Sequence, residues 1–522
     1  MKKNLAVFLS LMLASVLAEA KTIVIYHTSD IHGWYFARPA ASEGELAKKY
    51  IGGFPALSAL VKKEKLPHIL LDSGDTFVGT PVGNYTRGRA TVALFNKLGY
   101  SAATLGNHEF DYGAVVPKAM AATAKYPYLA SNLYLKKTGK VAPFVKPYTI
   151  IKKDGVRIGV IGAITEETAT ATLPRNVIDF TFRDKNETVR GAVEALKKEK
   201  VNAIVVITHS GLCADCSGKT LKQSEIKLTD ADYKDGNISM ARAAKGDIAV
   251  IMGGHNHTAL ADGYRDAESG TLLVESGAQL TAASRVELNF DDRTGKFTGA
   301  KDELVDLWTD KDGGDKKVAA VLAKYQKEVA GRMARKVAHT SFDLTRGDEK
   351  FSPAFCNLVS DYMMKIASGS VAAFQNLHGV RSDIPKGDIT YGEIYQALPF
   401  ENSLYELDMT GAQIADVISQ TVTGETSANC VGGLKAVYTL TADNKIGSLT
   451  VTVGGQPLDM NKTYRVVTNN FLAEGGSGGK VISKGTNKTD LDINIRDAIA
   501  AEMEKTGEIT LPEGGRIVKS DK

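Results

Sequence analysis

Short apolar runs alternate with stretches of helical periodicity over the first three hundred residues of the chain. The runs TIVIYHT, HILLDSG, SAATLG, VNAIVVIT and GDIAVIMGG have the length and composition of buried strands. Helical patterns follow at residues 53–64, 90–98, 115–125 and 187–198. This alternation predicts an α/β domain, and further strand-like runs at 156–161, 271–276 and 284–290 predict a second sheet. We therefore expect a sandwich of β-sheets flanked by helices.

The pattern changes after a polar, glycine-containing break at residues 310–315. A helical stretch at 316–336 has one apolar face, formed by Val318, Leu322, Tyr325 and Val329, and is typical of a linker helix. Beyond residue 339 the sequence predicts a smaller α+β domain, with helices at 351–367 and 410–422 and strands at 404–409, 436–441, 448–453 and 463–468. The expected division is 21–310 for the first domain, 311–337 for the linker helix and 338–522 for the second domain.

The first twenty residues have the pattern of a secretory signal peptide. Lys2 and Lys3 precede an apolar run at residues 5–17, and Ala18-Glu19-Ala20 forms a small-x-small cleavage site. The run is shorter than the roughly 20 residues that a membrane helix needs, and an uncleaved anchor helix is the alternative. We expect cleavage after Ala20 and a periplasmic or secreted protein without stable membrane insertion.

Composition excludes a polymeric nucleic acid as the partner, because 64 basic and 60 acidic residues are spread along the chain and leave a net charge of only +4. The even number of cysteines permits disulfides in an exported protein. The Cys213–Cys216 spacing favours a small loop-locking disulfide, with a metal clip or a redox switch as alternatives. Cys356 and Cys430 could pair across the second domain.

Metal-ligand residue types stand at the ends of five of the apolar runs. Of the nine histidines in the chain, five lie there: His32, His108, His209, His255 and His257. The carboxyl ends of strands in an open α/β sheet are where such folds build their sites. Carboxylates, one amide and several imidazoles gathered at that edge predict a pocket for two divalent transition ions.

Spacing within the motifs suggests how the ions are held. Side chains at i and i+2 on an extended backbone point the same way, so Asp30 with His32, and His255 with His257, could each hold an ion. Asp75 follows Gly74 and offers two carboxylate oxygens, which can bridge two ions. Each fragment alone is a weak signal, but their order and their position at strand ends indicate one centre.

The segment Asn107-His108-Glu109-Phe110-Asp111 suggests acid–base chemistry. Asn107 suits a neutral amide ligand, while His108 would face the substrate with its ring held by Asp111. A cationic imidazole beside a phosphoryl group stabilises developing negative charge. The alternatives are that His108 is a further ligand or that it only packs.

The motifs SDIHG, DSGDTFVGT, GNHEFDYG, THSG and GGHNH resemble those of the calcineurin-like metallophosphoesterases, and specifically of the bacterial exported 5′-nucleotidase / UDP-sugar hydrolase family. In the second domain the resemblance rests on NLHGVR, ITYGEIYQALPFEN and NNFLAEGGSGG. It implies a metallophosphoesterase sandwich followed by a 5′-nucleotidase-type domain. It also implies that one ion is held by Asp30, His32 and His257 and the other by Asn107, His209 and His255, with Asp75 bridging and His108 and Asp111 forming the catalytic dyad.

The resemblance also implies a substrate site in the second domain. Arg381 matches an arginine that contacts phosphate, Phe400 and Phe471 match a pair that sandwiches the base, and Asn402 matches a residue at the base edge. Two departures weaken the nucleoside assignment: Ser477 stands where the family commonly has Asp, and Arg346 is the nearby basic residue in an otherwise divergent stretch.

We therefore predict an exported metal-dependent phosphoric monoester hydrolase that releases phosphate from 5′-nucleotides by attack of a metal-bridging hydroxide. Two divalent ions, Zn, Mn, Co or Fe, are the expected cofactors. The resemblance also implies that motion between the domains gates the reaction. The alternatives with the same centre are a nucleotide-sugar pyrophosphatase, a 2′,3′-cyclic phosphodiesterase or a sulfur-ester hydrolase. The non-enzyme alternative is a nucleotide-binding protein without turnover.

Overall fold

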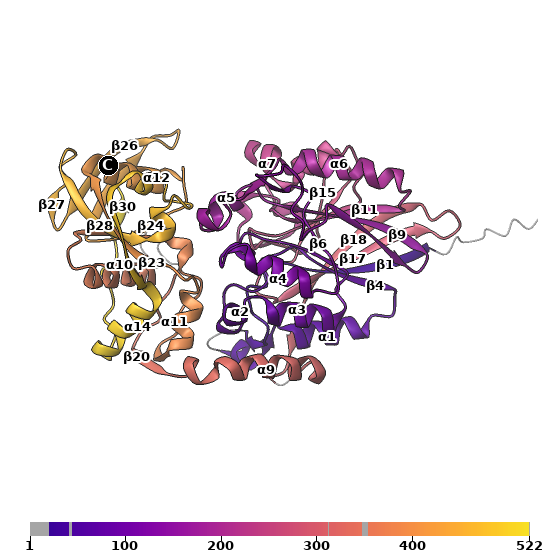
Figure 1. The fold of residues 1–522 in the computed structure, drawn as a ribbon, viewed down its shortest axis with the longest axis horizontal. Helices are drawn as coiled ribbons and strands as arrows, with labels where there is room; N and C mark the ends of the chain where they lie inside the picture. Colours follow the sequence, from indigo (N-terminus) through magenta and orange to yellow (C-terminus); the bar gives the residue numbers. More distant parts are fainter. Residues whose placement is uncertain (1–19, 41–43, 312, 347–352, 521–522) are drawn as a thin grey trace, which may run out of the picture.

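The computed structural model describes residues 20–40, 44–311, 313–346 and 353–520. Two domains lie side by side, and one long helix, α9 (Lys316–Met333), runs along the edge of the first domain towards the second (Figure 1). Residues 1–19 of the predicted signal peptide lie outside the described residues. Within the described part of the chain, no helix has both the length and the apolar character needed to cross a membrane.

The first domain contains two six-stranded sheets. In the first sheet, β1 (Ala20–Thr28), β4 (His68–Asp72), β5 (Ala102–Thr104) and β6 (Tyr128–Leu129) run parallel, and β17 (Ala282–Asp291) and β18 (Phe297–Asp306) extend it as antiparallel strands. In the second sheet, β9 (Val156–Ile164), β11 (Ala203–His209), β13 (Val250–Gly253) and β16 (Leu272–Glu275) run parallel, and the edge strands β8 (Tyr148–Lys153) and β15 (Tyr264–Arg265) are antiparallel. The loops that carry the metal-ligand residues discussed below follow β1, β4, β5, β11 and β13, which are parallel strands.

A core lies between the two sheets and includes Ile25, Leu71, Val205 and Met252. Outside the first sheet, α1 (Phe54–Lys63), α3 (Arg89–Leu98) and α4 (Val115–Thr123) cover a second core. Outside the second sheet, α6 (Lys185–Lys198) and α8 (Asn237–Ala243) cover a third. Because helices and the partner sheet bury both faces of the central strands, these strands are continuous apolar runs in the sequence. The predicted sandwich of sheets flanked by helices is confirmed.

The predicted linker helix is α9. The Asp315 carboxylate accepts a hydrogen bond from the backbone N–H of Lys317 (2.9 Å) at its start. Val318, Leu322 and Val329 are buried in the core that α1 and α3 share, so the apolar face packs on the first domain. The helix ends at Met333, slightly before the predicted end near residue 336, because the chain enters β20 (Lys336–Thr340) and pairs with β22 (Gly387–Thr390).

The second domain is built on two smaller sheets, ordered β24-β21-β28-β23-β29 and β27-β26-β25-β30. The strands of the first are β24 (Asn429–Gly432), β21 (Ala372–Asn376), β28 (Thr463–Asn469), β23 (Ser403–Thr410) and β29 (Thr486–Asn494). Those of the second are β27 (Gln456–Pro457), β26 (Ile446–Val453), β25 (Leu434–Leu440) and β30 (Ile517–Lys519). The helices include α10 (Ala354–Ile366), α11 (Tyr391–Ala397), α12 (Gly411–Thr423) and α14 (Ile495–Thr506). The predicted α+β class is confirmed; residues 351 and 352 of the predicted 351–367 helix lie outside the described residues.

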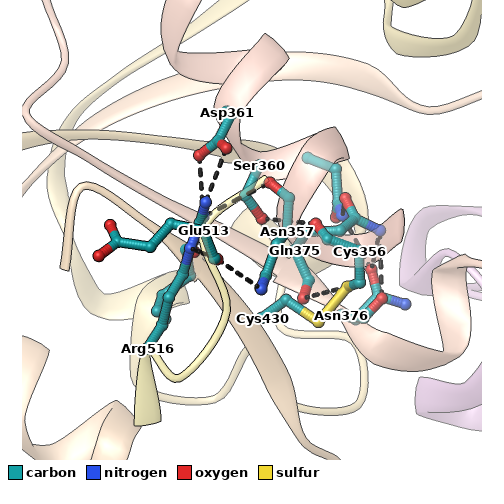
Figure 2. Close-up of a disulfide and its surroundings, with 11 residues drawn as sticks. Cys356, Asn357, Ser360, Asp361, Gln375, Asn376, Cys430, Glu513 and Arg516 are labelled. Atoms are coloured by element: carbon teal, nitrogen blue, oxygen red, sulfur yellow. Dashed lines mark hydrogen bonds and ion pairs between the residues drawn. A yellow bond between two sulfur atoms is a disulfide. The ribbon is translucent and has the colours of Figure 1, made fainter. Parts of the chain in front are cut away.

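All four cysteines form disulfides. Cys356 in α10 is bonded to Cys430 in β24, close to the ion pair in which the Arg516 guanidinium donates to both carboxylate oxygens of Asp361, at 2.8 and 2.7 Å (Figure 2). Cys213 is bonded to Cys216, which confirms the predicted loop-locking disulfide and leaves no thiolate pair for a metal clip.

Candidate metal centre and active site

The ends of five parallel strands bring the predicted metal ligands together. Three residues, Asp30, His32 and His257, have ligand atoms that all lie within 4.8 Å of one another. Asp30 and His32 follow β1, and His257 follows β13 of the other sheet. The two imidazoles face each other with their Nε2 atoms 2.9 Å apart, and the His257 Nε2 is 3.7 Å from Asp30 Oδ1. This first cluster therefore joins the two sheets at one edge.

A second cluster lies beside the first and contains Asp75, His209 and His255. The amide oxygen of Asn107 lies 3.2 Å from His209 Nε2 and 3.1 Å from His255 Nδ1, as expected of a neutral amide in this group. Asp75 Oδ2 is 3.1 Å from His209 Nε2 and 3.9 Å from His32 Nε2 of the first cluster. Asp75 thus lies between the two clusters, where a bridging ligand would have to be.

Five of these residues have a left-handed backbone: Asp30 (φ 51°), His32 (φ 50°), Asp75 (φ 55°), His255 (φ 77°) and His257 (φ 58°). The predicted extended backbone at these pairs is therefore wrong, since the chain turns sharply at each strand end, although Asp30 and His32 do share a cluster. His255 and His257 belong to different clusters as a result. A left-handed conformation costs a non-glycine residue about 1–3 kcal/mol and persists where surrounding contacts enforce it, commonly at functional sites.

Hydrogen bonds to the outer ring nitrogens orient the imidazoles. His32 Nδ1 is 2.7 Å from the Val78 carbonyl oxygen and His209 Nδ1 is 2.8 Å from the Ser73 carbonyl oxygen, so both rings present Nε2 to the clusters. His255 is reversed: its Nε2 is 3.1 Å from Glu167 Oε2 and its Nδ1 faces Asn107. Oxygen partners of this kind fix the tautomer of a metal-binding histidine. Glu167 is not among the site residues predicted from the sequence.

The electrostatics of the clusters suit cations. Burial raises the pKa of Asp30 to about 6 and lowers the pKa values of His32 and His257 well below their ordinary value. Burial also disfavours charge on His209, but the adjacent Asp75 carboxylate outweighs it and raises the pKa of His209 to about 10. The neutral imidazole nitrogens of His32 and His257, which face each other beside the buried Asp30, are a donor set for a divalent transition ion, whereas His209 would release its proton on binding one. The residues present fit two such ions.

Glu109 holds the Asp75 loop in place, a role that was not predicted from its position in the GNHEFDYG motif. The buried Glu109 carboxylate accepts hydrogen bonds from the backbone N–H groups of Asp75 (2.9 Å), Thr76 (2.8 Å) and Gly106 (2.6 Å). A Cβ at Gly106 would lie 2.1 Å from Asp75 Oδ1, so only glycine at position 106 leaves room for the Asp75 carboxylate.

His108 and Asp111 form the predicted pair. His108 Nδ1 lies 2.8 Å from Asp111 Oδ2, and Thr172 Oγ1 donates to Asp111 Oδ1 (2.8 Å). Burial disfavours the imidazolium, but the carboxylates of Asp111 and Asp75 outweigh it and raise the pKa of His108. His108 belongs to neither described cluster, and its Nε2 is 4.0 Å from Asp75 Oδ2. The pair therefore lies beside the two clusters without being part of either.

A cavity of 660 Å³ opens onto both clusters and onto the second domain. It is lined by all the residues predicted to contact substrate: Arg346, Arg381, Phe400, Asn402, Phe471 and Ser477. The Phe400 ring stacks on the His108 ring, with centroids 5.4 Å apart, and Arg381 Nη2 lies 3.3 Å from His32 Nε2. Residues of the second domain thus reach the metal-ligand clusters directly.

Two of these residues have specific local support. The Arg346 guanidinium donates to the Arg381 carbonyl oxygen (2.9 Å) and so backs the loop that carries Arg381. A Cβ at Gly476 would lie 2.5 Å from the Phe471 ring, so glycine is what allows this ring to lie against the backbone. Whether Phe400 and Phe471 sandwich a base stays a prediction.

Comparison with known proteins agrees with this arrangement. Residues 23–259 match the calcineurin-like phosphoesterase family, and residues 329–484 match the C-terminal domain of 5′-nucleotidases. The chain belongs to this two-domain phosphoesterase family. The resemblance drawn from the motifs is confirmed, and the chain is a metal-dependent phosphoesterase.

Several family members are similar over most of the chain. The chain is 27% identical to a 5′-nucleotidase of Vibrio cholerae, and the match covers 87% of this chain and 85% of that protein. It is 26% identical to UshA of Escherichia coli, and that match covers 87% of this chain and 86% of UshA. It is 30% identical to the trifunctional nucleotide phosphoesterase YfkN of Bacillus subtilis, but it spans 33% of the length of that protein. The solved 5′-nucleotidase precursor of Thermus thermophilus, 26% identical, superimposes with a TM-score of 0.80 and covers 96% of this chain and 100% of that one.

Proposed function

We propose that this chain hydrolyses 5′-nucleotides to a nucleoside and phosphate with two bound divalent ions. One observation carries the proposal: a single cavity joins two metal-ligand clusters, an acid–base pair and a wall from the second domain that holds an arginine and two aromatic rings. The 5′-nucleotidases of Vibrio cholerae and Thermus thermophilus share this two-domain organisation along most of their length, which supports the substrate class.

In this proposal Asp30, His32 and His257 would hold one ion, and Asn107, His209 and His255 would hold the other, with the Asp75 carboxylate available to either. Bound divalent ions supply an activated water and neutralise phosphate oxygens. The chain's own contribution is to orient three of the ligand imidazoles, His32, His209 and His255, through hydrogen bonds to Val78, Ser73 and Glu167 respectively. These contacts keep the ring nitrogens pointed inward before any ion arrives.

The acid–base pair acts on the phosphoryl group. In its protonated form, which Asp111 favours by raising the pKa of the ring, His108 would stabilise negative charge on the phosphoryl oxygens or donate a proton to the leaving oxygen. Arg381 presents a planar fork at 3.3 Å from His32 and is placed to bind a phosphate oxygen. Phe400 and Phe471 offer flat surfaces for a base, with stacking worth about 1–3 kcal/mol per base.

We further propose that the enzyme works outside the cytoplasm. The signal-peptide pattern at residues 1–20 and the two disulfides both suit an oxidising compartment. In that setting the reaction would produce a nucleoside from a nucleotide that cannot itself cross a membrane.

Substrate profiling of the purified protein tests the proposal. Protein stripped of metals is reloaded with Zn²⁺, Mn²⁺, Co²⁺ or Fe²⁺ and assayed against AMP, UDP-glucose, a 2′,3′-cyclic nucleotide and a thiosulfate ester, with Asp75→Asn as the inactive control. We expect AMP to be turned over fastest, with two ions bound per chain. Faster turnover of another ester would reassign the substrate, and nucleotide binding without turnover under every metal would leave a binding protein.

A further inference from the structure

The Cys213–Cys216 disulfide closes a loop that lies against the turn carrying two metal ligands. We define the disulfide loop as residues 213–218. Asn256 Nδ2 donates to the Cys213 carbonyl oxygen (3.0 Å), and the Asn256 carbonyl oxygen accepts from Ser217 Oγ (3.0 Å) and from the Gly218 N–H (2.9 Å). Thr258 Oγ1 donates to the Cys216 carbonyl oxygen (3.1 Å). Four hydrogen bonds therefore connect the disulfide loop to residues 256–258.

Asn256 is the residue between His255 and His257, which belong to different clusters. Both histidines have a left-handed backbone, with φ of 77° and 58°, so this turn does not hold its shape by its own conformational preference. The Asn256 side chain also depends on a glycine at position 211, because a Cβ there would lie 2.1 Å from Asn256 Nδ2. The turn that aims both imidazoles is thus fixed through Asn256.

The disulfide determines where the acceptor groups lie. Cys213 and Cys216 are 2% and 4% exposed and belong to the core outside the second sheet. The loop that the disulfide closes contains a short 3₁₀ turn, Ala214–Cys216, whose first backbone N–H also donates to Asp232 Oδ1 (3.0 Å). Without the sulfur–sulfur bond, the carbonyl groups that bind Asn256 and Thr258 gain conformational freedom, and this entropy opposes the ordered loop.

We propose that the disulfide loop is a positioning element for the metal centre, so that ion binding by His255 and His257 depends on the oxidised Cys213–Cys216 pair. The inference rests on the proposed function only in requiring that ions bind these clusters. A dithiol protein or reagent would reduce the Cys213–Cys216 disulfide. The dithiol supplies two electrons and two protons, which convert the disulfide to two thiols, and the dithiol itself becomes a disulfide. The reduced enzyme would then hold its ions more weakly.

Ion affinity of paired cysteine variants tests this inference. Cys213→Ser/Cys216→Ser is compared with Cys356→Ser/Cys430→Ser, which removes the disulfide of the second domain. Affinity for Zn²⁺ and Co²⁺ is measured by competition with a chromophoric chelator, and folding of each ion-free variant by circular dichroism. We expect the first variant to lose about tenfold or more in affinity, the scale seen when partners of metal ligands are removed, and the control to match the unaltered chain.

A second variant keeps the disulfide and removes one contact. Asn256→Ala should lower affinity in the same direction by a smaller factor, and this result remains informative if the cysteine variant does not fold. In the Cys356→Ser/Cys430→Ser background, a phosphine reductant should release ions and reoxidation should restore binding. The inference is overturned if the folded Cys213→Ser/Cys216→Ser and Asn256→Ala variants bind ions as tightly as the unaltered chain does. It is also overturned if the Cys356→Ser/Cys430→Ser control loses as much affinity as Cys213→Ser/Cys216→Ser. Failure of the unaltered chain to bind ions would instead overturn the proposed function.

Discussion

Replacing His108 by asparagine separates acid–base chemistry from metal binding. The substitution removes the imidazole whose Nδ1 lies 2.8 Å from Asp111 and whose ring stacks on Phe400. It keeps the backbone N–H that donates to Asp75 Oδ1 (2.9 Å), so the carboxylate between the clusters retains this support. We therefore expect both ions to stay bound while turnover falls.

The size of the loss follows from the role. A positioned acid or base contributes about 10²- to 10⁴-fold, which is roughly 2.7–5.5 kcal/mol in the activation barrier. Because Asp111 and Asp75 raise the pKa of His108, the protonated form persists to higher pH than in a free histidine. Activity that needs this proton is present below the raised pKa and is lost as pH rises through it. Asp111→Asn removes part of the raising effect and should move this loss to lower pH.

Steady-state kinetics with saturating metal, combined with elemental analysis of the purified variants, checks both parts. His108→Asn should have a kcat at least about 10²-fold lower, two ions per chain and no high-pH decline attributable to the histidine. Loss of an ion would mean that His108 is a ligand, and an unchanged kcat would mean that it only packs against Phe400.

Three further substitutions test other parts of the site. Asp75→Asn should remove both ions and all measurable turnover, because its carboxylate lies between the clusters, and elemental analysis would expose the error if ions remained. Phe471→Ala should raise KM about tenfold and change kcat less, as expected for lost stacking, and an unaltered KM would argue against a base slot. Glu167→Ala should weaken ion retention about tenfold by equilibrium dialysis, since it frees the outer nitrogen of His255, whereas the exposed, remote Glu194→Ala should have no effect.

Much of the first domain could be predicted because of how its strands are buried. Strands such as β11 are covered on both faces, so each is a continuous apolar run that ends abruptly at polar residues. Those ends coincide with the metal ligands, which made the site visible in the sequence. The end of α9 could not be predicted, because residues 336–340 are recruited by pairing with β22, a strand far along the chain.

The backbone conformations and long-range contacts of the site were outside the reach of the sequence pattern. Nothing local in Asp30 or His257 signals a positive φ, which arises from the turns that the surrounding fold imposes. Glu167 contacts a histidine 88 residues away, and its own neighbourhood looks like an ordinary loop. Arg381 reaches His32 across 349 positions, and only docking of the two domains brings them together.

The left-handed residues of the metal centre also bear on the stability of the protein. Aspartate and histidine are retained there at positions that glycine would occupy with less strain, so ligation is gained at a cost to the ion-free fold. Ions that bind only the folded chain offset that cost by mass action. The melting temperature should therefore increase with metal concentration. The metal centre would then stabilise the association of the two sheets in addition to its catalytic role.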